Sequence, residues 1–281
     1  VPTTGAATAA APGTAPVGSG AATATYTINS NTQITATAPA GSAGTVDVTV
    51  TTVGGTSATS AADQFTYVSA PTVTSISPTA GPTAGGTSVV ITGTNFSGTT
   101  AVTFGATAAT GFTVNSATQI TATAPAHAAG TVDVRITTVG GTSATSAADQ
   151  FTYVAAPTVT SVSPTAGPAA GGTSVVITGT NLSGATAVTF GATAATGFTV
   201  NSATQITATA PAGSPGTVDV RVTTVGGTSA TSAADQFTYV TAPTVTAISP
   251  TAGPAGGGTT VTITGTGFAA APGTSAVRLR A

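Results

Sequence analysis

The sequence has no cysteine, no lysine and no glutamate, and only 4% of its 281 residues are charged. Without cysteine there is neither a disulfide bond nor a thiolate metal site. The charges are six Asp and four Arg, and a net charge of −2 offers no basic surface for nucleic acid or for an anionic membrane. No apolar run is long enough to span a bilayer, so we expect no membrane insertion.

Helical periodicity is also absent. Thr, Ala, Gly and Ser dominate, and short stretches rich in β-branched residues alternate with Gly and Pro. In "GTVDVRITTVGG", for example, Val132, Val134 and Ile136 alternate with polar residues. This alternation is typical of β-strands with one buried face, and it predicts an all-β protein.

An internal repeat sets the organisation of the chain. Residues 71–156 and 157–242 both begin with "PTVT", have the same length and differ at only nine positions. Each copy contains about seven short strands separated by turns, which is the size of one β-sandwich. We therefore expect two complete domains, at 71–156 and 157–242.

The blocks of the repeat resemble a known family. The run "SPTAGPTAGGTSVVITGTNF…VTFG…TQITATAPA…GTVDVRITTVGGTS…FTYV" is similar to the IPT/TIG domain, and the resemblance extends in pieces to both ends of the chain. It implies tandem immunoglobulin-like β-sandwiches. The family includes receptor modules, domains of DNA-binding transcription factors, domains of starch-active enzymes and tandem arrays on bacterial surfaces. The near-identical, Thr/Ala-rich copies look most like the surface arrays, which implies an extracellular or cell-surface location in a bacterium.

The two outer segments look like partial repeats. Residues 21–70 match the later strands of a complete copy, whereas residues 243–281 match only the first strands and stop where "AVTFGA" ends in the other copies. Residues 1–20 align best with 261–280, but most of the apolar alternation is lost there. We thus expect an incomplete domain at 1–70 and the first half of another at 243–281.

Half of a sandwich cannot bury its apolar face. We expect the C-terminal half of one copy to complete the N-terminal half of the next by strand addition, giving a head-to-tail homopolymer. The expected donor residues are Val245, Ile248, Val261, Ile263, Phe268, Val277 and Leu279; the expected acceptor residues are Ile34, Val46, Val48, Phe65 and Tyr67. Two alternatives stay open: a fragment of a long surface adhesin array, and a carbohydrate-binding accessory module whose partners are host or matrix glycans.

Few residues of the sequence could take part in catalysis or metal binding. His127 is the single histidine, and two carboxylates recur in each repeat, in "TVDV" and in "ADQF". A solvated loop histidine, surface charge pairs such as Asp133 with Arg135, and aspartates that cap turns account for these residues. We expect no enzyme activity, no cofactor and no bound metal.

The links between repeats are short, at residues 69–70, 155–156 and 241–242. Such links leave little room for independent tumbling, so the sequence predicts a rod. Small-angle scattering of the purified chain should give the distance distribution of an elongated particle, and a compact globule would contradict the tandem arrangement.

Overall fold

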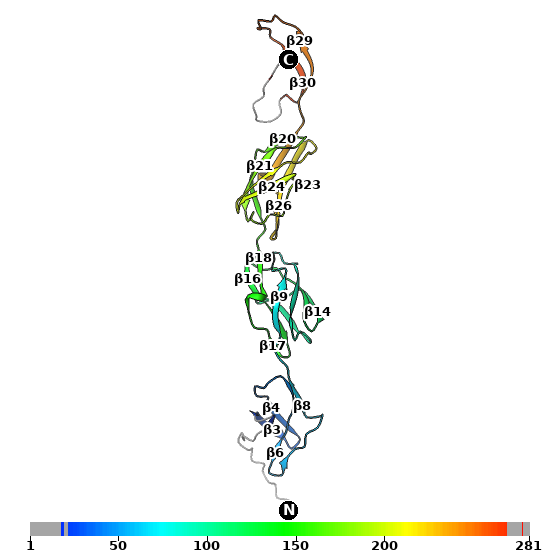
Figure 1. The fold of residues 1–281 in the computed structure, drawn as a ribbon, viewed down its shortest axis with the longest axis vertical. Helices are drawn as coiled ribbons and strands as arrows, with labels where there is room; N and C mark the ends of the chain where they lie inside the picture. Colours follow the sequence, from blue (N-terminus) through cyan, green and yellow to red (C-terminus); the bar gives the residue numbers. More distant parts are fainter. Residues whose placement is uncertain (1–17, 20–21, 269–276, 278–281) are drawn as a thin grey trace, which may run out of the picture. The chain divides into compact units, whose positions relative to one another are not determined.

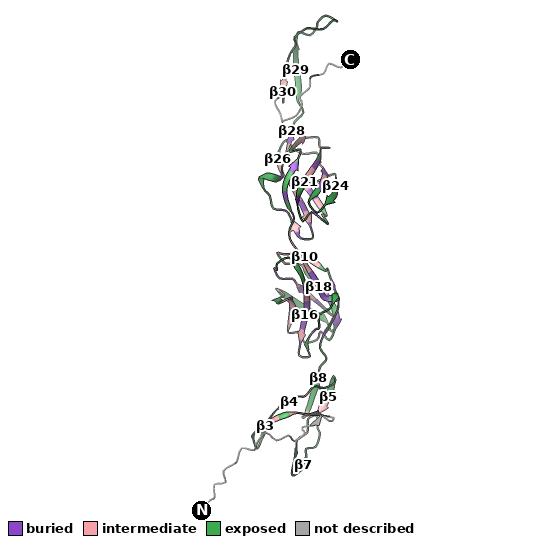
Figure 2. Ribbon diagram, turned by 90° about the vertical axis from the view of Figure 1, so that its left-hand side faces the viewer, coloured by how far each residue is buried: buried purple, intermediate pink, exposed green. Residues whose placement is uncertain are grey.

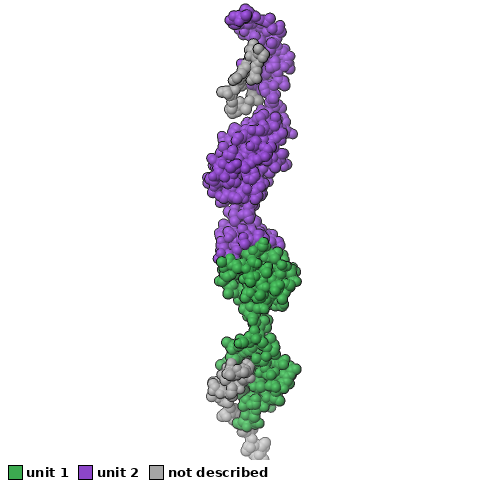
Figure 3. Space-filling model, in the orientation of Figure 1, with its two compact units in different colours: residues 1–77, 90–122, 133–149 green, residues 78–89, 123–132, 150–281 purple. Residues whose placement is uncertain are grey.

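The computed structural model describes residues 18–19, 22–268 and 277. These residues form β-strands joined by turns, with two short 3-10 helices, which confirms the all-β prediction (Figure 1). The internal contacts divide the chain into two compact units (Figure 3). The first unit contains residues 1–77, 90–122 and 133–149, and the second contains residues 78–89, 123–132 and 150–281. The repeat 157–242 lies wholly in the second unit and serves as the reference domain.

The reference domain consists of two sheets. One sheet has the strand order β19-β21-β25-β24, and the other has the order β20-β28-β26-β22-β23, with β27 paired to β26. The strands are β19 (Thr158–Ser163), β20 (Ala166–Pro168), β21 (Ser174–Thr180), β22 (Ala187–Phe190), β23 (Thr193–Ala194), β24 (Gly197–Ser202), β25 (Gln205–Thr209), β26 (Gly216–Thr224), β27 (Gly227–Thr228) and β28 (Gln236–Val240), and the 3-10 helix η2 is Ala233–Asp235.

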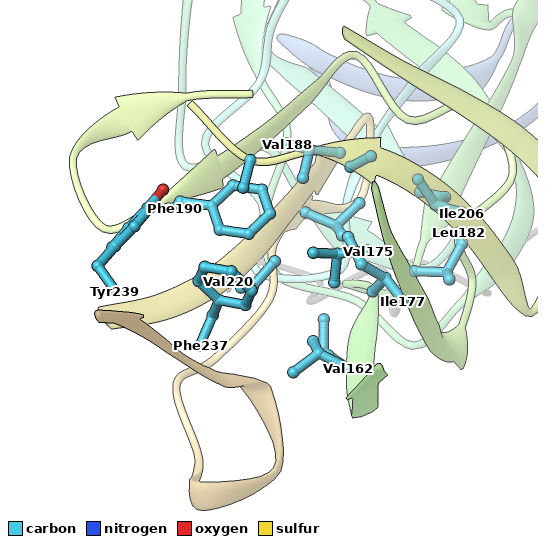
Figure 4. Close-up of a cluster of buried hydrophobic side chains, with 14 residues drawn as sticks. Val162, Val175, Ile177, Leu182, Val188, Phe190, Ile206, Val220, Phe237 and Tyr239 are labelled. Carbon is cyan, nitrogen blue, oxygen red and sulfur yellow. The ribbon is translucent and has the colours of Figure 1, made fainter. Parts of the chain in front are cut away.

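Alternation along the strands builds the core of this domain. In β26, Val220 and Val222 are fully buried, whereas Asp219 and Arg221 face outward and are half-buried. Fourteen buried side chains from both sheets form one cluster (Figure 4): Val159, Val162, Val175, Ile177, Leu182, Val188, Phe190, Ile206, Ala208, Ala210, Val220, Val222, Phe237 and Tyr239. The domain is thus held by apolar faces that neither sheet could bury alone.

The other segments contain the same kinds of strand. Residues 71–156 contain β9 (Thr72–Ser77), β10 (Ala80–Pro82), β11 (Ser88–Thr94), β12 (Ala101–Phe104), β13 (Thr107–Ala108), β14 (Gly111–Ser116), β15 (Gln119–Thr123), β16 (Gly130–Thr138), β17 (Gly141–Thr142), η1 (Ala147–Asp149) and β18 (Gln150–Val154). The outer segments contain β1 (Gly18–Ser19), β2 (Ala22–Thr23), β3 (Thr25–Ser30), β4 (Gln33–Thr37), β5 (Gly44–Asp47), β6 (Thr51–Thr52), β7 (Gly55–Thr56) and β8 (Gln64–Tyr67), and β29 (Thr244–Ser249) and β30 (Thr262–Thr266).

One glycine permits the first two long strands of the domain to pair closely. The register of β19 against β21 shifts between Val159 and Ser161, and Gly179 lies opposite Val159. A β-carbon at Gly179 would overlap the carbonyl oxygen of Thr158. Gly93 and Gly265 stand in the same position against Thr72 and Thr244, so the constraint recurs in each copy of these strands.

This close approach predicts that alanine destabilises the domain much more at one glycine than at another. G179A should destabilise the domain by about 1–3 kcal/mol, because the backbone of β19 has to move. G197A, at a strand position with open space around it, should change stability by less than about 1 kcal/mol. Urea unfolding of the full chain, followed by circular dichroism, measures both. Equal effects of the two substitutions would contradict the packing argument.

A buried aspartate precedes the last strand of each complete repeat. Asp149 and Asp235 have no exposed surface. The backbone amide of Ser232 donates to both carboxylate oxygens of Asp235, at 3.2 and 3.1 Å, and the amide of Ser146 donates to Asp149 at 3.0 Å. The prediction that these residues cap turns is confirmed, and their complete burial is an additional finding.

Burial raises the pKa of the Asp149 and Asp235 carboxyls above the usual 3.8. The amide hydrogen bonds from Ser146 and Ser232 oppose this shift, and the outward carboxylates of Asp133 and Asp219 add to it. A carboxyl whose pKa is raised by folding takes up a proton when the domain folds. Its contribution to stability is therefore greatest at low pH and declines as the pH rises through the folded-state pKa.

The pH dependence can be tested by removing the titrating group and keeping the hydrogen-bond acceptor. The free energy of unfolding of the wild-type chain should decline as the pH rises from about 4. D149N/D235N should lose most of that decline, because asparagine still accepts from the serine amides but does not titrate. D219N removes only an outward carboxylate that adds to the shift of Asp235, so it should keep most of the decline. A decline that persists unchanged in D149N/D235N would show that other groups cause it.

Candidate functional site

The N-terminal segment exposes residues whose counterparts are core residues in the complete repeats. A shift of 172 positions, two repeat lengths, places β3, β4, β5 and β8 on β24, β25, β26 and β28. Ile34, Val48 and Phe65 are 37%, 38% and 43% exposed, whereas their counterparts Ile206, Val220 and Phe237 are fully buried. We call the five predicted residues Ile34, Val46, Val48, Phe65 and Tyr67 the acceptor face. Val46 and Tyr67 are half-buried.

Most of the acceptor face surrounds a shallow groove of about 200 Å³. Val46, Val48, Phe65 and Tyr67 line it, together with small residues such as Ala36 and Ala38. The rings of Phe65 and Tyr67 meet edge to face at 5.0 Å, and the Tyr67 hydroxyl donates to the carbonyl oxygen of Pro39 at 2.8 Å. The aromatic pair therefore has the arrangement of Phe237 and Tyr239, whose rings are 5.1 Å apart, although the described residues of this segment form no second sheet over it.

Strand structure is lost in this segment at a specific place. In the reference domain, β26 is continuous over nine residues, and its second half pairs with β22. In the N-terminal segment, β5 ends at Asp47, residues 48–50 are not in a strand, and β6 begins at Thr51. The gap falls on the residues whose counterparts pair with β22. The β1–β2 hairpin, in which Gly18 pairs with Thr23 and Ser19 with Ala22, matches the pairing of the end of β22 with β23. Among the described residues, however, β1 is not joined to residues 48–50 in a sheet, and the absence of this pairing accounts for the gap.

The C-terminal segment shows the reverse deficiency. A shift of 86 positions places β29 on β19, and β30 on the last five residues of β21, and the two pair with the same shift in register. Val245, Ile248, Val261 and Phe268 are 61%, 46%, 38% and 47% exposed, and Ile263 is half-buried. Val277 is 73% exposed, and Leu279 lies outside the described residues. We call these seven predicted residues the donor face.

The donor face borders a second apolar groove, of about 590 Å³. Val245, Ile248, Val261, Ile263 and Val277 line it, with the glycine-rich turn that follows β29. Within this turn, residues 252–254 are not in a strand. Their counterparts form β20, which pairs in parallel with β28. Here too, a stretch whose counterpart has a partner strand is not in a strand, and the described residues of this segment contain no counterpart of β28.

Figure 2 shows the contrast in burial: the described residues of 24–70 and 243–268 include no fully buried residue, whereas the complete repeats contain many. Together the donor face and seven residues of the N-terminal segment, four of them in the acceptor face, correspond to one complete core. Seven of the fourteen core residues of the reference domain align with the donor face, and the other seven align with Ile34, Ala36, Ala38, Val48, Val50, Phe65 and Tyr67.

The sequence prediction missed Ala36, Ala38 and Val50, because small side chains carry little signal of their own. The 172-residue alignment with the buried Ala208, Ala210 and Val222 identifies them. Val46, which was predicted, aligns with Val218, a partly buried neighbour of the core. The prediction that residues 1–20 leave the strand positions unoccupied mostly concerns residues outside the described part of the chain. The two described residues go against it, because Gly18 and Ser19 form β1, which pairs with β2 as the end of β22 pairs with β23.

Among the described residues, the side chains that could take part in catalysis or metal binding do not come together in one site. His127 stacks on Tyr153 at 4.9 Å, and its Nδ1 lies 2.8 Å from the carbonyl oxygen of Ala128. Arg135 donates through Nε and Nη2 to the carbonyl oxygen of Ser143, at 3.0 and 2.8 Å. The described residues contain no group of three His, Cys, Asp or Glu side chains that could hold a metal ion. Nor do they include a helix of the length and hydrophobicity needed to cross a membrane.

A comparison with known structures gives matches with low TM-scores, of which three are described. The extracellular region of plexin A4 is 24% identical over 62% of this chain and 18% of its own, with a TM-score of 0.41. The protein SGBP-B from a xyloglucan utilization locus of Bacteroides uniformis is 27% identical over 57% of this chain and 48% of its own, with a TM-score of 0.27. Invasin, a bacterial integrin-binding protein, is 15% identical over 74% of this chain and 48% of its own, with a TM-score of 0.26.

The chain thus spans less than half of each of these three proteins, and the low TM-scores leave function undecided. No curated protein matches the sequence. The family comparison is decisive, because the model of the IPT/TIG domain matches four successive stretches: residues 14–67, 71–153, 157–239 and 243–280. These matches cover most of the chain and coincide with the strand-containing segments described above. The protein belongs to the IPT/TIG domain family.

Proposed function

We propose that the protein is a structural subunit of an extracellular filament or surface stalk, in which the donor face of one copy completes the acceptor face of the next. The observation that carries the proposal is the division of one core between the two faces. Seven of the fourteen core residues of the reference domain align with residues 34–67, and the other seven align with residues 245–279. Residues 1–20, which align with 261–280, have Thr3 and Ser19 where the donor face has Ile263 and Leu279. Two copies of the chain would thereby form a complete sandwich at their joint.

The register of the joint follows from the reference domain. There, Ile177 of β21 lies opposite Ile206 of β25, and Val175 lies opposite Ala208. The same pairing in the joint would place Ile263 opposite Ile34, and Val261 opposite Ala36. Both pairs point inward in the reference domain, so the joint would bury them.

Two further pairings complete the joint. Residues 252–254 would run parallel to β8, as β20 runs parallel to β28. Residues 276–279 would pair with residues 48–51, as β22 pairs with β26. Residues 48–50 and 252–254 are not in a strand in the structure, so strand formation at these residues would accompany assembly.

The energetics favour a durable joint. Burying a large apolar side chain stabilises by about 1.5–3 kcal/mol, and the donor face contributes seven such residues. Several kcal/mol of association cost oppose this gain. Because the contact is head-to-tail and joins different surfaces, it can repeat without closing and would generate a filament.

A single charge in the donor face should prevent assembly. I263D would place a carboxylate opposite Ile34 in the joint, and burying it unpaired costs several kcal/mol. V225D adds the same charge at a 49% exposed valine outside both faces and serves as the control. We expect sedimentation and electron microscopy to show filaments for wild type and V225D, and monomers with both complete repeats folded for I263D. Filaments of I263D would contradict the proposal.

A second candidate is a long surface array, either adhesive or glycan-binding, and the near-identity of residues 71–156 and 157–242 favours it. In such an array, other repeats of the same chain would cover the two faces. A wild-type chain that stays monomeric at high concentration and is retarded by a polysaccharide in affinity electrophoresis would support this candidate instead.

A further inference from the structure

The first two links between repeats each contact a hairpin turn of the repeat that follows. The turn between β16 and β17 lies against the link at residues 69–70, where a β-carbon at Gly140 would overlap the carbonyl oxygen of Ser69. The turn between β26 and β27 lies in the same way against the link at residues 155–156, where a β-carbon at Gly226 would overlap the carbonyl oxygen of Ala155. In both places two backbones approach so closely that glycine is required.

An asparagine makes a second contact with each of these links. The Nδ2 of Asn95 donates to the carbonyl oxygen of Ala70, and the Nδ2 of Asn181 donates to that of Ala156, both at 3.2 Å. Gly267 stands at the equivalent position after the third link, and it has no side chain to donate. The described residues that follow the third link also contain no counterpart of the β26–β27 hairpin. The link at residues 241–242 therefore lacks both contacts.

A groove of about 370 Å³ lies at this third link. Residues 164–168 and 240–243 line it. They include Val240 and Thr241, the counterparts of Val154 and Ala155, whose carbonyl oxygens the β26–β27 turn approaches. Thr241 is exposed, whereas Ala155 is half-buried. The groove thus contains the residues that a hairpin turn contacts at the preceding link.

The N-terminal segment has such a hairpin and no link against it. The register of β7 on β6 is that of β27 on β26. The amide of Gly54 donates to the Thr52 hydroxyl at 3.2 Å, as the amide of Gly226 donates to the Thr224 hydroxyl at 3.1 Å. Gly54 and Thr52 are nevertheless exposed, whereas Gly226 and Thr224 are buried. Among the described residues, a β-carbon at Gly54 would meet only the Thr52 hydroxyl, at 3.6 Å.

We infer that the β6–β7 turn of one copy docks on the link at residues 240–242 of a second copy, with Gly54 against the carbonyl oxygen of Thr241. This inference rests on the proposed head-to-tail assembly, in which β6 and β7 take the places of the end of β26 and of β27. The turn already has the required conformation, and the groove at the link is open to receive it. Because Gly267 cannot donate to the link, the turn supplies the one remaining contact of the two.

The test adds a methyl group to the turn. G54A should raise the critical concentration for assembly about five- to fiftyfold, because the methyl group would meet the backbone of the link in the joint. Unfolding of the unassembled chain should be unchanged, since the methyl group has space there and the φ of Gly54 is not positive. G111A adds a methyl group at a strand position with open space, outside both faces, and should assemble like wild type. Sedimentation over a concentration series measures the critical concentration.

A second variant tests the contact within one chain. G226A places the same methyl group against the carbonyl oxygen of Ala155, so it should lower the urea midpoint of the unassembled chain, whereas G54A should not. Circular dichroism below the critical concentration measures both midpoints.

The outcomes separate the inference from the proposed function. Wild-type filaments, with G54A indistinguishable from G111A, would overturn the inference and leave the proposed assembly in place. An unchanged midpoint of G226A would also overturn the inference, because the contact between turn and link would then impose no constraint. A wild-type chain that does not assemble would overturn both the inference and the proposed function.

Discussion

The structure depends on one constraint: the core of a β-sandwich is made by two sheets, and neither sheet can bury its apolar face without the other. In the reference domain this condition is met by fourteen side chains from both sheets. In the N-terminal and C-terminal segments it is not met. Phe65 is 43% exposed although it keeps the edge-to-face contact with Tyr67 that Phe237 makes with Tyr239. The local structure therefore forms before the core is complete.

The same constraint acts on the backbone. Residues 48–50 and 252–254 have sequences close to those of β26 and β20, and they still do not form strands. Edge hydrogen bonds need a partner strand. For residues 252–254 the counterpart of that partner is β8 of the N-terminal segment. For residues 48–50 it is residues 276–279, although β1 repeats the end of the same strand. Strand formation and burial of apolar surface are thus expected to occur together when the two faces meet.

Because the protein has so few charges, other interactions stabilise the outward faces of its sheets. Cross-strand hydroxyl pairs occur at equivalent places in successive repeats, as between Thr45 and Thr66, Thr131 and Thr152, and Thr217 and Thr238, at 2.9–3.0 Å. Such pairs stabilise a sheet modestly and without long-range direction. The ten charged side chains are consequently the main source of electrostatic selectivity, and their positions matter more than they would in an ordinary protein surface.

Much of the fold was predictable from the sequence, because the repeat places strands and apolar positions in register. Ile177, Val220 and Phe237 are core residues, as the alternation around their counterparts indicates. The parallel pairing of β20 with β28 was not predictable, since it joins segments about seventy residues apart and depends on closure of the domain. Burial of Asp235 was not predictable either: "SAADQF" indicates a capped turn, but the packing of η2 against β19 removes the carboxylate from water. For the candidate site, large residues such as Ile34 and Ile263 were identified, whereas Ala36 and Ala38 needed the buried alanines of a complete repeat as a guide.

The central claim is that Ile263 of one copy lies opposite Ile34 of another, and the absence of cysteine permits a direct test. The variant I34C/I263C should form disulfide-linked multimers under mild oxidation, which appear as a ladder on a non-reducing gel. T35C/I263C, shifted by one residue and therefore directed to the opposite face of the strand, should not. Equal cross-linking in both variants, or a monomer band alone for I34C/I263C, would contradict the account.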